Sequence, residues 1–289
     1  MSGSALPGKR KRRTWIAAVW PSARRRRGAL RAVRRALRAF RRAPTPLQAG
    51  IVLAAAVIAW FALNWAYQVV RKPSELFFPV GGTLNKTPAE TWSRYSPLFR
   101  KYSTDVISPE LLAALAQVEG SGNPVARTYW RWSFKPAPFD LYRPASSAVG
   151  MYQITDGTFA EARRYCIRDH RVVEDGAWND WDSCWFNRLY TRVIPSHAVE
   201  LTAAYLDRAV ARALGARRPP HVALERERQL AALIHLCGAG AGEAYVRRGM
   251  RLAEGERCGD HAARDYVERV NALTRVFENL AAADSTPRT

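Results

Sequence analysis

Acidic residues are absent from the first 46 residues, a stretch that contains thirteen arginines and two lysines. This stretch therefore carries +15 of the formal net charge of +20, and the other 243 residues carry only +5. A basic run of this kind is typical of a solvated arm, a nucleic-acid-binding tail, or the cytoplasmic flank of a membrane segment. The basicity belongs to the tail alone, and the segment that follows it decides between these alternatives.

Charge of either sign is absent from residues 49–70, and Asn64 and Gln68 are the only strongly polar side chains there. As a helix, these 22 residues would extend roughly 33 Å, enough to cross the hydrocarbon core of a bilayer. Aromatic residues occupy the second half, where an interfacial belt is expected: Trp60, Trp65 and Tyr67. A buried helix of a soluble protein is the alternative, which the long polar flank disfavours. The sequence predicts a transmembrane helix.

No small-residue cleavage pattern follows the apolar run, and no lipid-bearing N-terminal cysteine is present. We therefore expect an uncleaved single-pass anchor. The positive-inside rule places the arginine-rich N-terminus in the cytoplasm and the rest of the chain outside. Within the tail, residues 29–42 place apolar side chains on one helical stripe among arginines, which suits an anionic inner leaflet: Leu30, Val33, Leu37 and Phe40. Nucleic acid is a disfavoured partner, because only the tail suggests it.

Cysteine pairs with zinc-site spacing are also absent, so no metal site is expected. All four cysteines follow the apolar run, and an even number in an exported domain favours two disulfides. Four cysteines allow three pairings. Proximity in the sequence favours Cys166–Cys184 and Cys237–Cys258.

No run alternates between apolar and polar residues for long enough to predict a strand, so the exported part is expected to be mainly α. Helices are expected at 108–119, 158–166, 195–214, 224–240 and 261–282. The predicted organisation is a cytoplasmic tail (1–46), a transmembrane anchor (47–70), a linker (71–107), a folded domain (108–282) and a disordered tail (283–289).

Glu119 stands out in the first expected helix. Ser108 and Pro109 are start signals for this helix, and glycines follow Glu119 as a stop signal. Leu112 and Leu115 lie on the same side of the helix as Glu119. A carboxyl group among apolar neighbours favours its protonated form, which a general acid requires. The alternative is an ordinary solvent-facing glutamate at a helix end.

Further motifs follow Glu119 in a fixed order: a Ser-Ala-x-Gly-Met-Tyr-Gln segment (147–153), a helix start at Thr158, a glycine-rich helix end (235–240) and a Tyr-Val-x-x-Val run (266–270). Together with the helix that ends in glutamate, this series resembles the catalytic domain of lytic transglycosylases over roughly residues 108–273. Two departures are visible. Gly120 occupies the position where the family has a serine, and the Tyr-Asn of the family's third element is replaced around His235 and Cys237.

The resemblance implies a lysozyme-like fold of the goose-type lysozyme and lytic transglycosylase class, in the periplasm of a bacterium and anchored to its inner membrane. It implies cleavage of the β-1,4 bond between N-acetylmuramic acid and N-acetylglucosamine in peptidoglycan, with formation of a 1,6-anhydro end. Glu119 would be the single general acid and base, and no cofactor is implied.

The same resemblance implies substrate-binding positions at Ser147, Gln153, His235 and Tyr266, and at the backbone near Met151 and Tyr152. Tyr266 could also hydrogen-bond near Glu119. Core packing is the alternative for Met151, Tyr152 and Tyr266, and a buried structural role is the alternative for His235. Four tryptophans could stack on sugars or pack loops: Trp130, Trp132, Trp178 and Trp181. Peptidoglycan strands and the membrane are the expected partners, with a secretion-system or cell-envelope complex as a further one. A peptidoglycan hydrolase and a non-catalytic peptidoglycan-binding component are the competing functions.

Overall fold

The computed structural model describes residues 23–77, 81–133, 137–180, 182–215 and 224–285. The chain divides into two compact units, Met1–Leu63 and Asn64–Thr289. The described part of the first unit contains α1 (Ala23–Arg42) and most of α2 (Thr45–Arg71). Val33 and Leu37 of α1 are exposed. Helix α2 is long and apolar enough to cross a membrane, and it exposes apolar side chains along that stretch.

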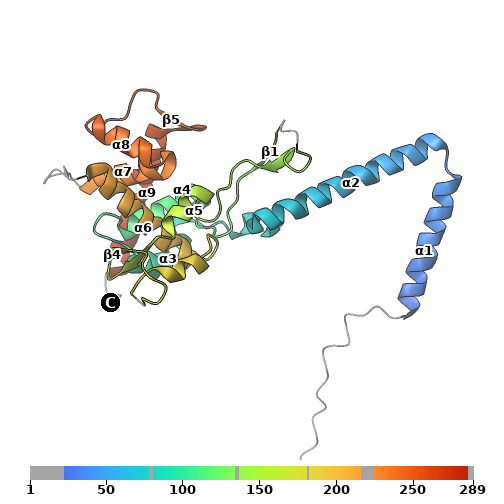
Figure 1. Ribbon diagram of the computed structural model, residues 1–289, viewed down its shortest axis with the longest axis horizontal. Coiled ribbons are helices and arrows are strands. Elements are labelled where there is room, and N and C mark those ends of the chain that lie inside the picture. Colours follow the sequence, from blue (N-terminus) through green and yellow to red (C-terminus); the bar gives the residue numbers. More distant parts are fainter. Residues whose placement is uncertain (1–22, 78–80, 134–136, 181, 216–223, 286–289) are drawn as a thin grey trace, which may run out of the picture. The chain divides into compact units, whose positions relative to one another are not determined.

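The second unit is mainly helical, as predicted (Figure 1). Its longer helices are α3 (Pro88–Lys101), α4 (Pro109–Gly120), α6 (Pro195–Leu214), α7 (Leu224–Cys237), α8 (Ala239–Arg247) and α9 (Ala263–Ser285). Helix α4 packs against α3 and α9, and α7 packs against α6, α8 and α9. One continuous apolar core joins these helices.

Helix α4 begins and ends as its sequence predicts. The Ser108 hydroxyl caps the helix by accepting a hydrogen bond from the Leu111 N–H at 3.3 Å. The helix ends at Ser121, whose φ of 50° is left-handed and whose N–H bonds back to the carbonyls of Ala116 and Gln117. Leu112 and the apolar residues beside it are fully buried. The middle of α4 is therefore buried on all sides, and its last turn places Glu119 at the edge of the core.

The prediction of a linker at 71–107 is wrong, because most of this segment belongs to the folded unit. Two short 3-10 helices, η2 (Pro73–Phe77) and η3 (Gly81–Leu84), lead into α3. A capping box at Thr87 and Glu90 starts α3. Trp92 and Phe99 of α3 are buried in the core. The folded unit thus begins at the end of α2.

Several element boundaries also differ from the predictions. Helix α9 continues to Ser285, and the Trp92 indole donates to Asp284 at 2.8 Å, so the start of the expected disordered tail is helical. Helix α5 spans only Asp156–Ala162. The expected helix at 224–240 breaks at Gly238, whose φ is +83°. Three short antiparallel pairs were not expected: β1 (Trp130–Trp132) with β2 (Tyr142–Pro144), β3 (Tyr165–Arg168) with β4 (Arg171–Glu174), and β5 (Arg257–Cys258) with β6 (His261–Ala262).

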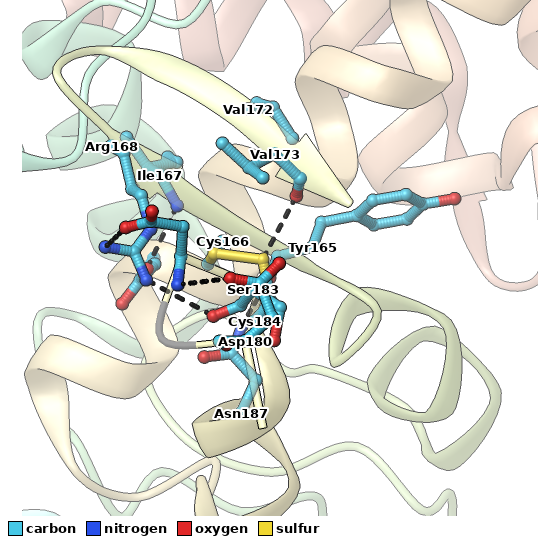
Figure 2. Close-up of a disulfide and its surroundings, with 12 residues drawn as sticks. Tyr165, Cys166, Ile167, Arg168, Val172, Val173, Asp180, Ser183, Cys184 and Asn187 are labelled. Atoms are coloured by element: carbon cyan, nitrogen blue, oxygen red, sulfur yellow. Dashed lines mark hydrogen bonds and ion pairs between the residues drawn. A yellow bond between two sulfur atoms is a disulfide. The ribbon is translucent and has the colours of Figure 1, made fainter. Parts of the chain in front are cut away.

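The structure pairs the cysteines as their proximity in the sequence suggests. Cys166 on β3 is bonded to Cys184, just before η4 (Trp185–Leu189) (Figure 2). The Asn187 amide donates to the Tyr165 carbonyl and joins the same two segments a second time. Cys237 at the end of α7 is bonded to Cys258 on β5. Each bond closes a loop beside the helical core.

Candidate functional site

Three helices bring Glu119, His235 and Tyr266 together. Glu119 lies in the last turn of α4, His235 near the end of α7, and Tyr266 near the start of α9. The Tyr266 hydroxyl donates to Glu119 Oε1 at 2.5 Å. His235 Nε2 lies 3.7 Å from the same oxygen. Among the described residues, none hydrogen-bonds to the other carboxyl oxygen, Oε2, so the two oxygens have different surroundings.

The Glu119 carboxyl is largely buried but not closed off from solvent. The Glu119 side chain is 17% exposed and that of His235 is 9% exposed. Tyr266 is buried, and burial raises the pKa of its hydroxyl well above the usual range. The adjacent charge and hydrogen bond of Glu119 act in the same direction. Tyr266 is therefore a permanent hydrogen-bond donor at any physiological pH.

Glu119 opens onto a cleft with a volume of about 410 Å³. The cleft is lined by the end of α4, by the η3 region and by the chain from Val125 to Tyr129. Glu119 is the only acidic side chain among the described residues that line it. Asn85, Asn123 and Thr128 add neutral polar groups to the wall. Arg127 also lines the cleft, with its charge paired to Glu75. One acid, one paired cation and several amide or hydroxyl groups suit a hydroxyl-rich ligand.

Asn123 holds the wall of the cleft in place. Its side-chain amide donates to the Gly81 carbonyl at 2.5 Å and to Asn85 Oδ1 at 2.9 Å. Its Oδ1 accepts the Val125 N–H at 3.0 Å. Asn123 is buried, so these bonds are shielded from water. One asparagine thus joins the segment before α3 to the loop after α4.

Gly120 is required by a close approach of two backbone segments. A Cβ atom built at Gly120 would lie 2.9 Å from Met151 Cα and 3.0 Å from the Met151 carbonyl oxygen. Both contacts are to backbone atoms, which cannot rotate out of the way. A serine at this position would force α4 and the 147–153 loop apart. The departure from the family pattern therefore has a steric reason in this chain.

The 147–153 loop is built around its own hydrogen bonds. Gln153 has a φ of +46°, and its amide donates to the carbonyls of Ala126 at 3.1 Å and Gly150 at 2.9 Å. Ser147 Oγ accepts the Asp156 N–H at 3.1 Å. The predicted sugar contacts of Gln153 and Ser147 stay predictions.

Met151 and Tyr152 belong to the apolar core. Both side chains are fully buried, as the core-packing alternative expects. The ring of Tyr152 lies edge-on to that of His235, with centroids 6.4 Å apart. Any sugar contact at Met151 or Tyr152 would have to come from the main chain. The Tyr152 ring instead packs against the histidine that lies beside Glu119.

No protein-family model matches the chain, and no curated protein matches it. The resemblance to lytic transglycosylases therefore rests on the order of the sequence motifs alone and stays a prediction. In the described part of the chain, no three His, Cys, Asp or Glu side chains lie close enough to hold a metal ion.

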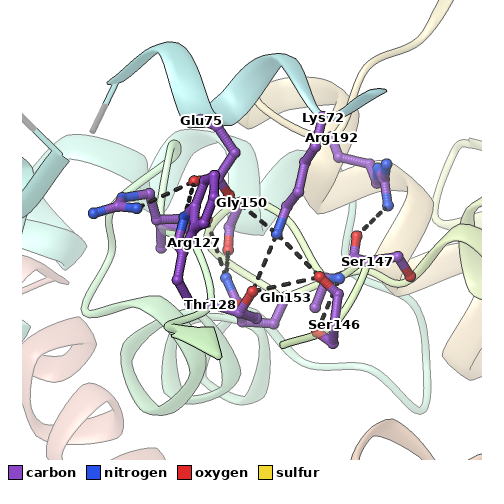
Figure 3. Close-up of polar contacts among 12 residues, drawn as sticks. Lys72, Glu75, Arg127, Thr128, Ser146, Ser147, Gly150, Gln153 and Arg192 are labelled. Carbon is purple, nitrogen blue, oxygen red and sulfur yellow. Dashed lines mark hydrogen bonds and ion pairs between the residues drawn. The ribbon is translucent and has the colours of Figure 1, made fainter. Parts of the chain in front are cut away.

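A buried ion-pair cluster behind the cleft was not predicted (Figure 3). Glu75 of η2 has no exposed surface. Its carboxyl pairs with Lys72 at 3.5 Å and Arg127 at 3.1 Å, and it accepts the Trp130 indole N–H at 2.8 Å. Burial lowers the pKa of Lys72. Because Arg127 also lines the cleft, this cluster attaches the segment after α2 to the cleft wall.

The tryptophans that could stack on sugars lie elsewhere. Trp130 and Trp132 are on β1 and pack against Tyr142, and Trp178 is largely exposed. Neither these nor any other described tryptophan lines the cleft with Glu119. Trp181 lies outside the described residues.

Proposed function

We propose that this protein is a membrane-anchored lytic transglycosylase that cleaves peptidoglycan glycan strands, with Glu119 as its single general acid and base. One observation carries the proposal. A largely buried carboxyl, held through Oε1 by Tyr266, opens onto a cleft whose wall carries amide and hydroxyl groups and Arg127. The motif resemblance agrees with the position of this residue at the end of α4.

The geometry suggests a role for each carboxyl oxygen. Protonated Glu119 gives the proton on Oε2 to the glycosidic oxygen, and the bond from that oxygen to C1 of N-acetylmuramic acid breaks. The resulting carboxylate then takes the proton of the C6 hydroxyl, and the C6 oxygen bonds to C1 to form the 1,6-anhydro ring. Tyr266 keeps its proton throughout and stabilises the carboxylate that forms after the first transfer.

A hydrolase that follows either common route would need a second carboxyl group in the cleft. Hydrolysis by the two common routes uses a second carboxyl, either as nucleophile or as base for a water. Glu119 is the only acid among the described residues of the cleft wall. The intramolecular reaction needs no second carboxyl, which favours the transglycosylase over the hydrolase.

The anchor proposal follows from α2. This helix is long and apolar enough to span a bilayer, and a strongly basic segment precedes it. We place the N-terminus in the cytoplasm and the folded unit in the periplasm of a bacterium, attached to the inner membrane.

Product analysis tests the proposal. Purified full-length protein in detergent is incubated with peptidoglycan sacculi, and the released fragments are weighed by mass spectrometry. Anhydro-muropeptides support a transglycosylase, whereas reducing ends would show a hydrolase. Binding to sacculi without cleavage would show a non-catalytic component.

Two variants sharpen this assay. Glu119→Gln keeps the shape of the side chain and removes its acid, so product release should stop. Glu110→Gln is the matched control, because Glu110 lies in the first turn of the same helix and outside the cleft lining. Full activity of Glu119→Gln would contradict both enzymatic readings.

A further inference from the structure

The two polar residues of the apolar run bind a part of the folded unit. The Asn64 amide donates to the Tyr142 carbonyl and the Gln68 amide to the Phe139 carbonyl, both at 2.7 Å. The ring of Tyr67 stacks on that of Phe139, with centroids 5.1 Å apart. These carbonyls belong to the β1–β2 arm, which we define as residues 129–133 and 137–145. Asn64 and Gln68 are buried by this contact.

The position of these bonds along α2 sets the depth of the arm. Asn64 lies six residues before Val70, the end of the uncharged run, which corresponds to about 9 Å along a helix. An unpaired carbonyl at that level of a bilayer would cost several kcal/mol. The two amides remove this cost for Tyr142 and Phe139. These hydrogen bonds give Asn64 and Gln68 a function in an otherwise apolar span.

The composition of the arm fits the boundary between headgroups and acyl chains. Trp132 is 57% exposed, and Leu141 is also exposed. Aromatic side chains of this kind concentrate at membrane interfaces, where the ring lies among acyl chains and the polar edge meets the headgroups. Arg131 on β1 is exposed and supplies a cation for lipid phosphates, whereas Arg143 on β2 pairs with Asp140 at 4.0 Å.

We propose that the β1–β2 arm inserts into the interface of the bilayer that α2 spans, on the side of the folded unit. The lipid of that leaflet covers its exposed aromatic side chains. The proposal rests on α2 being a membrane span, and it does not depend on the cleavage chemistry at Glu119. It makes the anchor a two-part device, with one helix across the membrane and one arm at its surface.

The arm is also joined to the cleft. Thr128 and Tyr129 line the cleft and lead directly into β1, and Trp130 donates to the buried Glu75. Lys72 Nζ donates to Thr128 Oγ1 at 3.2 Å and to the Ser146 carbonyl at 3.3 Å (Figure 3). An arm held at the lipid surface therefore fixes the orientation of the cleft relative to the membrane plane.

Lipid-quenching fluorescence tests the proposal on the full chain. A single added cysteine at Leu141 carries an environment-sensitive fluorophore in vesicles of phosphatidylethanolamine and phosphatidylglycerol that contain lipids spin-labelled near the headgroup. The same label at Leu189, an exposed residue of η4, is the control for the folded unit. The same label at Leu63 of α2 reports the span, with lipids labelled deep in the acyl chain.

We expect the Leu141 and Leu63 labels to lose fluorescence and the Leu189 label to keep it. If Leu63 is quenched but Leu141 is quenched no more than Leu189, the arm proposal is overturned and the anchor stands. If Leu63 is not quenched, both fail. Cleavage of sacculi is measured separately, so its absence would refute the proposed activity without affecting this result.

A double variant tests the role of the two amides. Asn64→Leu with Gln68→Leu makes the span more apolar and removes the two amide donors to the arm, while the ion pair of Arg71 with Asp140 stays. We expect the Leu141 label to lose much of its quenching while the Leu63 label keeps its own. Unchanged quenching at Leu141 would overturn the role assigned to Asn64 and Gln68.

Discussion

Tyr266→Phe removes a single hydroxyl from the candidate site and leaves the ring in place. That hydroxyl lies 2.5 Å from Glu119 Oε1, and Tyr266 is only 4% exposed, so the site offers little room for water to replace it. A hydrogen bond to a charged group contributes about 1.5–3 kcal/mol. If this bond is made mainly to the carboxylate that forms during the reaction, its loss slows turnover by about 10- to 100-fold.

The assay is the rate of release of anhydro-muropeptides from sacculi by the full-length protein. Tyr245→Phe is the matched control, because Tyr245 is an equally buried tyrosine on α8 outside the cleft lining. It should keep its rate, and thermal melting should show that both variants are folded. A wild-type rate for Tyr266→Phe, alongside an inactive Glu119→Gln, would refute the role given to the tyrosine.

Three further predictions concern stability. Gly120→Ala places a methyl group against the Met151 backbone, so we expect a loss of about 1–3 kcal/mol in denaturant unfolding; unchanged stability would contradict the close approach. Replacing Cys237 and Cys258 by alanine reopens a loop with a sequence separation of 21, which should cost about 3 kcal/mol and lower the melting temperature. Burial lowers the pKa of His197 below 6.5, so the unfolded chain binds its proton more tightly. Stability should therefore fall as the pH drops below about 6.5 and through the folded pKa, and His197→Phe should flatten this slope in melting curves.

Local signals predicted the helix that carries Glu119. A capping serine, a proline in the first turn, an apolar stripe and a glycine stop all act within a few residues of one another, so α4 could be predicted almost to the residue. Helix α6 was predicted equally well, because its proline start and its apolar face are also local. Glu119 could be singled out for the same reason, since its side of the helix follows from spacing alone.

Features that depend on distant contacts could not be predicted. Helix α3 was not predicted because Pro97 lies inside it and because its contacts are remote in the sequence. Asp284, for example, accepts a hydrogen bond from the Trp92 indole N–H. The cleft wall was missed for a similar reason, since Asn123 and Asn85 meet only after folding. The steric need for Gly120 depends on Met151, which no sequence pattern places beside it.

The docking of residues 71–107 sets how far the cleft can reach. As a flexible linker, these 37 residues would let the domain range over roughly 30–35 Å from its attachment point. Instead, Glu75 and α3 hold the segment within the folded unit, so almost no slack remains after α2. With α2 as the anchor, the distance that the cleft can reach from the membrane is limited to the size of the folded unit. Under the proposed function, cleavage would then be confined to the glycan strands nearest the membrane, and deeper layers of the wall would lie out of range.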